Sequence, residues 1–149
     1  MNRLSDTEII EICNKLNLPI NYIGFKDNIN EIKQGFYIIN LQSKFINGDG
    51  THWTAFYVSG IPSQLNIYYD SFGFPAPDEV EKLIKPYVYN CHDIQNINSS
   101  SCGFYCIAFI KFLNKLTNKI KAYEHFLKLF SNDNTKNEMI LKDILYKNI

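Results

Sequence analysis

The sequence predicts an α+β fold, with a small, mostly antiparallel central sheet, helices at both of its ends and one buried helix packed against it. Runs of aromatic and β-branched residues between positions 36 and 69 are typical of strands. Apolar residues recur at helical spacing near both ends of the chain. The stretch 102–113 is long enough for a helix and apolar on nearly every side, which indicates burial. The 149 residues contain no internal repeat or linker, so we expect residues 1–149 to form one domain.

Composition narrows the possible functions. Fifteen basic residues balance fifteen acidic ones, so the chain has no global field to steer nucleic acid. Because no run of about 18 apolar residues occurs, we expect no membrane span. The first residues lack the apolar core of a signal peptide. We therefore expect an intracellular protein whose four cysteines are reduced thiols.

The first part of the chain predicts one helix and two extended segments. Ser5 and Glu8 have the spacing of a capping box, and the helix that follows should stop before Pro19. Residues 22–25 suggest a short extended segment, and 27–33 a polar loop or short helix. Residues 36–41 read as a strand that is buried on at least one face. The apolar face of the predicted helix consists of Ile9, Ile12, Cys13 and Leu16.

The middle of the chain predicts further strands and one helix. A turn with two glycines at 48–51 leads into a strand from Trp53 to Val58, and a turn at 59–63 joins it to a strand at 65–69. Asp78 is placed to cap a helix that extends to Ile84. Residues 86–89 are a candidate strand that leads into a polar loop.

The last third of the chain should be helical. The buried helix begins at or just after Cys102, and two amphipathic helices follow at about 120–130 and 135–146. We expect Asn134 or Thr135 to cap the last of these.

Cys102 is the candidate nucleophile. It stands at the N-terminus of the predicted buried helix, where unpaired backbone N–H groups and the helix dipole favour an anion. A cysteine in such a position can have its pKa lowered from about 8.5 into a range of roughly 3.5–7.5. The alternative is a buried cysteine with no chemistry, which we expect for Cys13. Cys106 lies one turn further on, and a disulfide or metal pair with Cys102 is conceivable.

A thiol nucleophile needs a base and a group that orients the base. His52 precedes one strand and Asp70 follows the next, so antiparallel pairing would bring the two together. Gln95 could offer an amide N–H to an oxyanion. His92 and His125 are the other histidines, but neither has so well placed a carboxylate. A zinc site at Cys91, His92, Cys102 and Cys106 has no second C-x₂₋₄-C pair to complete the spacing of structural zinc.

The ordered motifs resemble a known family. They are His52-Trp53, then Asp70-Ser71-Phe72-Gly73-Phe74, then Gln95 followed after six residues by Cys102-Gly103. This set resembles the adenovirus-type (adenain-like) cysteine proteases and, more distantly, the SUMO and ubiquitin-like-protein proteases of the same clan. The resemblance covers most of residues 5–115.

The resemblance implies a papain-like, adenain-type fold and a cysteine endopeptidase, with Cys102, His52 and Asp70 as its triad and Gln95 in the oxyanion hole. It implies a viral maturation protease, from a virus or virus-like mobile element, that cuts capsid and core precursors after small, glycine-containing sequences. We expect the chain to be a monomer. Such an enzyme works inside the host cell and is packaged in the virion. The residues that would line the substrate site are Trp53, Ser101 and Gly103.

Two departures from the family pattern leave alternatives open. The acid is Asp70 where the adenovirus enzymes carry Glu, which is closer to the SUMO proteases. The adenovirus enzymes also use DNA and a disulfide-linked viral peptide as activators, and Cys91 is the nearest candidate for that link. The other readings are a ubiquitin-like-protein (SUMO-type) protease, an acyltransferase of the same clan and, least favoured, a non-catalytic binding module. A basic run that could contact nucleic acid consists of Lys111, Lys115, Lys119, Lys121 and Lys128.

Overall fold

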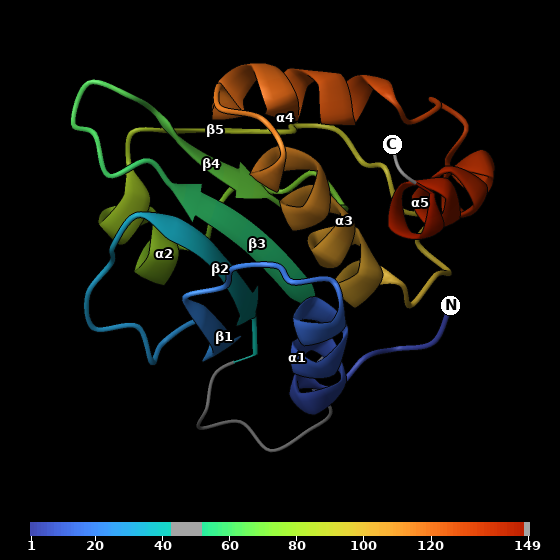
Figure 1. Cartoon of the computed structure of the whole chain (residues 1–149), viewed down its shortest axis with the longest axis horizontal. Coiled ribbons are helices and arrows are strands. Elements are labelled where there is room, and N and C mark those ends of the chain that lie inside the picture. The colour runs from blue at the N-terminus through green and yellow to red at the C-terminus, as the bar shows by residue number, and fades with distance from the viewer. Residues whose placement is uncertain (43–51, 148–149) are drawn as a thin grey trace.

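The computed structural model describes residues 1–42 and 52–147. It is an α+β structure in which helices cover both faces of a five-stranded sheet (Figure 1). The strands are β1 (Tyr22–Phe25), β2 (Gly35–Asn40), β3 (Trp53–Val58), β4 (Asn66–Tyr69) and β5 (Tyr87–Tyr89). The helices are α1 (Asp6–Lys15), α2 (Asp78–Ile84), α3 (Cys102–Asn114), α4 (Lys119–Lys128) and α5 (Asn137–Tyr146), with a 3₁₀ turn η1 (Asn134–Lys136) before α5.

The sheet is mixed, so the predicted mostly antiparallel sheet is wrong. Its strands follow the order β1-β2-β3-β4-β5, and only β2–β3 and β3–β4 pair antiparallel. Both outer strands pair parallel to their neighbours. The chain must cross back before a parallel strand can start. Helix α2 makes that crossing between β4 and β5, and residues 26–34 make it between β1 and β2 without the short helix that was the alternative reading of 27–33.

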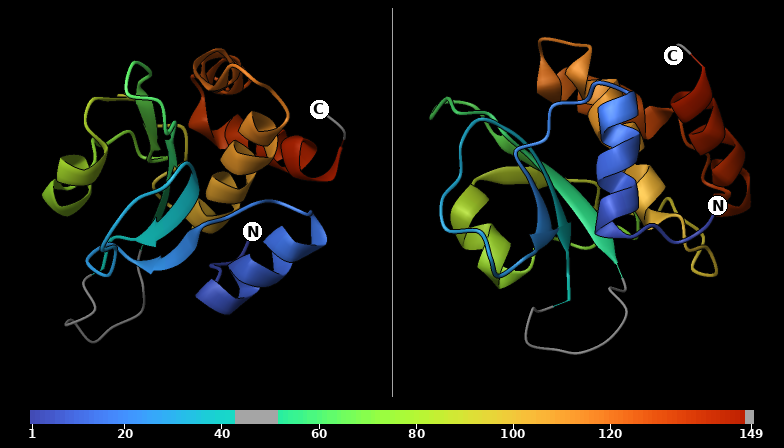
Figure 2. Two further views of the ribbon diagram at one scale, coloured as in Figure 1. Left: turned by 60° about the vertical axis from the view of Figure 1, so that its left-hand side comes forward. Right: turned by 60° about the horizontal axis from the view of Figure 1, so that its bottom comes forward.

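Both faces of the sheet are buried, because alternate side chains of the central strands enter two separate cores. The larger core, on one face, includes side chains of α1, α3 and α4, with α5 packed against α3, and the other face packs against α2 (Figures 1 and 2). Along β2, for example, Ile38 enters the larger core and Ile39 the smaller one. This two-sided burial explains why β3 is buried along its whole length.

The predicted helix α3 is confirmed as the buried centre of the larger core. Its residues from Cys102 to Ile110 are nearly all buried, and α1, α4 and α5 surround it together with β3. Helix α1 begins with the predicted capping box, in which the Ser5 Oγ accepts the Glu8 N–H at 3.2 Å and the Glu8 carboxylate accepts the Ser5 N–H at 3.0 Å.

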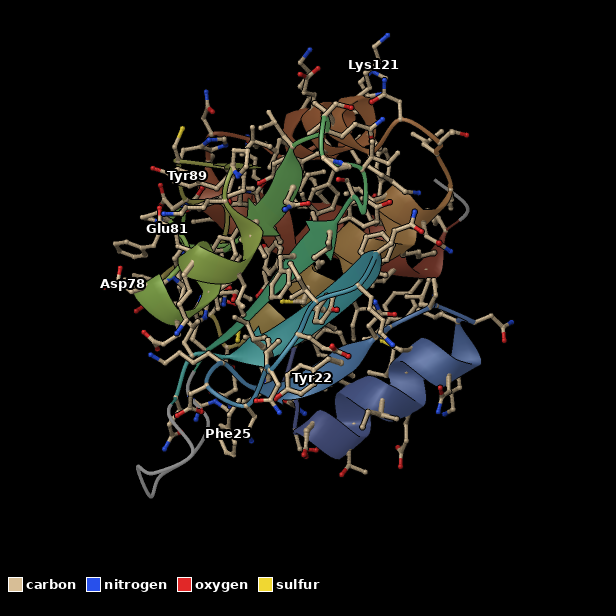
Figure 3. The ribbon with its side chains drawn as sticks, turned by 90° about the vertical axis from the view of Figure 1, so that its left-hand side faces the viewer. Tyr22, Phe25, Asp78, Glu81, Tyr89 and Lys121 are labelled. Carbon is tan, nitrogen blue, oxygen red and sulfur yellow. The ribbon has the colours of Figure 1, made fainter. Side chains whose placement is uncertain are left out.

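Two predicted helix caps are wrong. Helix α2 has Pro77 as its N-cap, and the Pro77 carbonyl accepts the Val80 and Glu81 N–H groups, so Asp78 is already inside the helix. Neither Asn134 nor Thr135 caps α5. Both lie within the 3₁₀ turn η1, whose cap is Asp133. The side chains of Asp78 and Glu81 mark α2 in Figure 3, with Tyr22 and Phe25 of β1 at one end of that view and Lys121 of α4 at the other.

The described residues contain no helix with the length and apolarity needed to cross a membrane. The glycine-containing turn predicted at 48–51 lies outside the described residues.

Candidate active site

His52 and Asp70 lie side by side at one end of the two central strands. Strand β3 begins directly after His52, and β4 ends directly before Asp70. Antiparallel pairing sets Ala55 opposite Tyr69, which brings the two flanking residues together. The Nε2 atom of His52 is 2.7 Å from Oδ1 of Asp70, and Asp70 is almost completely buried. The predicted pairing of these side chains is therefore present.

Cys102 is the first residue of α3, as predicted. Ser101 is the N-cap, and it offers no side-chain hydrogen bond to the helix. The backbone N–H of Trp53 donates to the Cys102 Sγ at 3.4 Å, which ties the start of β3 to the start of α3. Because this amide and the unpaired N–H groups of the first helical turn surround the sulfur, they favour a thiolate over a thiol.

The positive charge of the His52 imidazolium and the negative charge of the Cys102 thiolate stabilise each other. Burial disfavours the imidazolium form, but hydrogen bonding and charge attraction to Asp70 and Cys102 outweigh it and raise the pKa of His52 to about 9. Burial likewise disfavours the Cys102 thiolate, but interactions with His52 and with the backbone N–H groups of Trp53 and Gly103 outweigh it and lower the pKa of Cys102. Opposite shifts of this kind are what a thiolate–imidazolium pair requires.

Only one ring nitrogen of His52 has a hydrogen-bond partner among the described residues. Nε2 is bound to Asp70, which leaves Nδ1 for the thiol. Nδ1 is buried and makes no close hydrogen bond to any described residue, although Cys102 is near enough for each group to shift the pKa of the other. We infer that a small side-chain adjustment would complete the Nδ1–Sγ bond, since such bonds are often long without substrate.

A network that the sequence did not indicate holds Asp70. Its Oδ1 also accepts the Phe72 N–H at 2.8 Å, and the Phe72 ring stacks on His52 with centroids 4.8 Å apart. The buried Asn90 donates from Nδ2 to the Asp70 carbonyl at 2.6 Å, and its Oδ1 accepts from the Asp70 N–H and the Tyr123 hydroxyl at 3.3 Å each. Asn90 follows a predicted strand, but no motif distinguishes it from any loop asparagine.

Gln95 is buried between the Asp70 segment and the loop before Cys102. Its Oε1 accepts the Ser71 hydroxyl at 2.6 Å, and its Nε2 donates to the Ser99 carbonyl at 2.9 Å. The Ser99 hydroxyl lies further from Nε2, at 3.3 Å. The Ser99 carbonyl can only accept, which fixes the orientation of the amide. One N–H of Gln95 is thus firmly bound within the loop, and the other is held only weakly.

Gly73 lets the Asp70 segment touch the Gln95 loop. Its φ is +83°, and a Cβ on it would stand 2.5 Å from the backbone carbon of His92. Next to it, the Ser71 carbonyl accepts the N–H groups of Ile94 and Gln95 at 2.8 and 3.0 Å. A residue larger than glycine would push these two segments apart.

The three predicted substrate-site residues have structural contacts. The Trp53 indole is buried and donates from Nε1 to the Leu4 carbonyl at 2.9 Å. The Ser101 hydroxyl donates to Glu138, and Gly103 is buried against Leu4. Substrate contact by these residues stays a prediction.

The other candidate residues lie apart from this arrangement or have other partners. His92 and His125 are exposed. The Nζ of Lys111 donates to the carbonyls of Ile144, Leu145 and Lys147 at the end of α5. The Nζ of Lys119 donates to the Leu113 and Leu116 carbonyls, so two members of the basic run serve as helix C-caps.

Cys13, Cys91, Cys102 and Cys106 are free thiols, and only Cys91 is exposed. Within residues 1–42 and 52–147, no three His, Cys, Asp or Glu side chains are grouped so that they could hold a metal ion. Neither the protein-family models nor the curated proteins compared with the chain gave a match.

Proposed function

We propose that the protein is a cysteine endopeptidase in which Cys102 is the nucleophile, His52 the base and Asp70 the group that orients His52. One arrangement carries this proposal. Cys102, at the first position of a buried helix, has a pKa that His52 helps to lower, and the buried Asp70 holds His52 at 2.7 Å. Most buried cysteines have a raised pKa instead, as do Cys13 and Cys106 of this chain.

The reaction follows from the order of these groups. His52 holds the proton of Cys102, and the sulfur attacks the carbonyl carbon of the scissile peptide bond. His52 gives that proton to the leaving amine as the C–N bond breaks, which leaves a thioester on Cys102. A water molecule, deprotonated by His52, then hydrolyses the thioester and restores the thiolate–imidazolium pair. Asp70 holds the ring and stabilises its positive charge.

The tetrahedral oxyanion needs hydrogen-bond donors near Cys102. The backbone N–H of Cys102 belongs to the first turn of α3, where N–H groups have no partner within the helix, and Gln95 has an N–H that is only weakly held in the loop. We assign both to the oxyanion. Removal of one such donor typically slows an enzyme by about 10²–10³-fold.

For substrates we propose extended segments with glycine or another small residue before the cut bond, such as those of viral capsid and core precursors. This part of the proposal rests on the resemblance of the motifs to the adenovirus-type proteases. The nearly complete burial of Cys102, which is 4% exposed, fits it, because a bulky side chain next to the scissile bond would have little room.

The test is cleavage of a library of extended peptides that contain glycine at defined positions, followed by mass spectrometry. We expect cleavage after small residues by the wild type and none by Cys102→Ala, with Cys106→Ala as the matched control that still cleaves. Turnover by Cys102→Ala would refute the assignment. A wild type that labels fast at Cys102 but cuts no peptide, even with folded ubiquitin-like substrates or acetyl-CoA supplied, would leave a binding module as the better reading.

A further inference from the structure

The loop between β5 and α3, residues 90–101, determines how Gln95 and Cys102 face each other. It has no regular secondary structure, so its conformation depends on the contacts that hold it. The C-terminal part of the chain, η1 and α5, supplies several of these contacts. Figures 1 and 2 show α5 beside the end of α3 at which the loop arrives.

One group of contacts holds the first half of the loop. The completely buried Asn137 donates from Nδ2 to the Ile94 carbonyl at 2.8 Å, and its Oδ1 accepts the Ser131 N–H at 2.7 Å. Asn134 donates to the carboxylate of Asp93. The residue directly before Gln95 is therefore fixed to α5.

Glu138 holds the second half. Its Oε1 accepts the hydroxyl groups of Ser99 at 2.6 Å and of Ser101 at 2.7 Å. Hydroxyl groups that donate to an ionised carboxylate make bonds about twice as strong as those between neutral partners. Ser101 is the N-cap of α3, so one carboxylate oxygen binds both the loop and the residue directly before Cys102.

Ser99 connects Glu138 to Gln95. Its hydroxyl donates to Glu138, and its carbonyl accepts the Gln95 amide at 2.9 Å. The path from Glu138 to the amide thus passes through a single residue. At the other end of the amide, the Ser71 hydroxyl bonds Oε1 at 2.6 Å. With these two ends fixed, the direction of the second Gln95 N–H depends on where Ser99 is held.

The two carboxylate oxygens of Glu138 differ in their contacts. Oε2 is buried and has no hydrogen-bond partner among the described residues, as is the case for the nearby Tyr105 hydroxyl. Burial and the charge of Glu138 both raise the pKa of Tyr105. All the hydrogen bonds that the carboxylate makes to described side chains therefore go to the two serines of the loop.

We propose that Glu138 is a positioning residue, which acts through Ser99 to hold the Gln95 amide for the oxyanion. The proposal rests on the proposed cysteine endopeptidase function. Glu138 does not touch the reacting atoms, so its loss should affect only the steps in which an oxyanion develops.

The test compares Glu138→Gln with Asp143→Asn. Asp143 is also on α5, and its carboxylate makes an exposed ion pair with Lys147, so its amide variant is a matched control. In Glu138→Gln we expect kcat for peptide hydrolysis to fall about tenfold, less than for loss of the whole donor, with KM unchanged. Alkylation of Cys102 by iodoacetamide forms no oxyanion and should stay within about twofold of the wild type.

A double variant tests whether Glu138 acts through Gln95. If Glu138 acts through Gln95, then Gln95→Ala with Glu138→Gln should be no slower than Gln95→Ala alone, within about twofold. Losses that multiply would overturn the proposal, as would an equal fall of hydrolysis and alkylation in Glu138→Gln. Should Glu138→Gln fold poorly, Ser99→Ala removes the connecting hydroxyl. It should likewise lower kcat for peptide hydrolysis and leave the rate of Cys102 alkylation unchanged.

One measurement does not need catalysis. The side-chain amide signals of Gln95 in a ¹⁵N–¹H NMR spectrum, assigned by their loss in Gln95→Ala, should shift and exchange faster in Glu138→Gln but not in Asp143→Asn. Unchanged signals in Glu138→Gln would overturn the proposal. If the wild type cleaved no peptide, the proposed function would fail, and these signals would still decide whether Glu138 holds Gln95.

Discussion

The Nε2 atom of His52 is 2.7 Å from Oδ1 of Asp70, although 17 residues separate the two in the sequence. A single antiparallel strand pair brings them together, and the buried Asn90, directly after β5, fixes the backbone of Asp70. The base of the proposed protease is therefore oriented by the central strands of the sheet.

Replacement of Asp70 by Asn should keep the shape of this contact and remove its charge. We expect kcat to fall by as much as about 10⁴-fold, as occurs when a triad aspartate is replaced in serine proteases. Peptide hydrolysis checks this, with Asp143→Asn as the control. Activity close to that of the wild type would mean that Asp70 does not orient the base.

The pH dependence of peptide hydrolysis should report on the thiolate–imidazolium pair of Cys102 and His52. Activity requires a deprotonated Cys102 and a protonated His52, so it should rise with pH through the lowered pKa of Cys102 and fall with pH near 9, the raised pKa of His52. In Asp70→Asn the falling limb should move to lower pH, because Asp70 raises that pKa. A falling limb that stays in place would mean that the Asp70 carboxylate does not raise the pKa of His52.

A limiting amount of iodoacetamide at about pH 6 should distinguish the four thiols by their labelling rates. An ordinary thiol of pKa about 8.5 is almost wholly protonated there. Burial raises the pKa of Cys13 to about 12 and raises the pKa of Cys106 well above its ordinary value. We expect Cys102 to label faster than the exposed Cys91, and this order to reverse in His52→Ala. Mass spectrometry of the labelled peptides reads both rates. Faster labelling of Cys91 in the wild type would argue against a thiolate at Cys102.

Asn90→Ala should destabilise the protein. The change leaves the buried Asp70 N–H without its partner, at a cost of about 1–3 kcal/mol, whereas the Asp70 carbonyl still accepts the Gly73 N–H and the Tyr123 hydroxyl still donates to the Tyr68 carbonyl. Urea unfolding measures the free energy of unfolding, and the exposed Asn114→Ala serves as control. A similar small effect of both substitutions would mean that water replaces the Asn90 side chain.

Lys111→Met should also destabilise, because the Lys111 ammonium bonds three carbonyls at the end of α5. We expect a loss of about 1 kcal/mol in the free energy of unfolding, since the site is partly exposed. Lys121→Met is the control, on an exposed part of α4 (Figure 3). Equal stability of the two variants would return Lys111 to the candidate nucleic-acid surface.

Helices and strands were predicted well where the apolar pattern of the sequence matches the burial in the structure. The capping box at Ser5, the buried helix at Cys102 and the pairing of His52 with Asp70 are all present. Strand direction was missed, because alternating apolar residues look the same in parallel and antiparallel strands. The helix between β4 and β5 was the available signal for a parallel crossover.

The polar network could not be predicted from the sequence. Asn90 and Ser99 are common polar residues in segments without periodicity, and the apolar pattern that predicts α5 does not distinguish Glu138 from its other polar residues. Each takes its place through contacts made across the fold. Gln95 was singled out only by its spacing from Cys102. Its hydrogen bond to Ser99 depends on a loop conformation that α5 imposes, which no local pattern encodes.

The dependence of the loop on α5 bears on biosynthesis. Cys102, His52, Asp70 and Gln95 all leave the ribosome before the residues that fasten the loop, Asn137 and Glu138. An incomplete chain therefore carries every reacting group but lacks the contacts that hold the loop between Gln95 and Cys102. A protease built in this order would reach its full activity only after α5 docks.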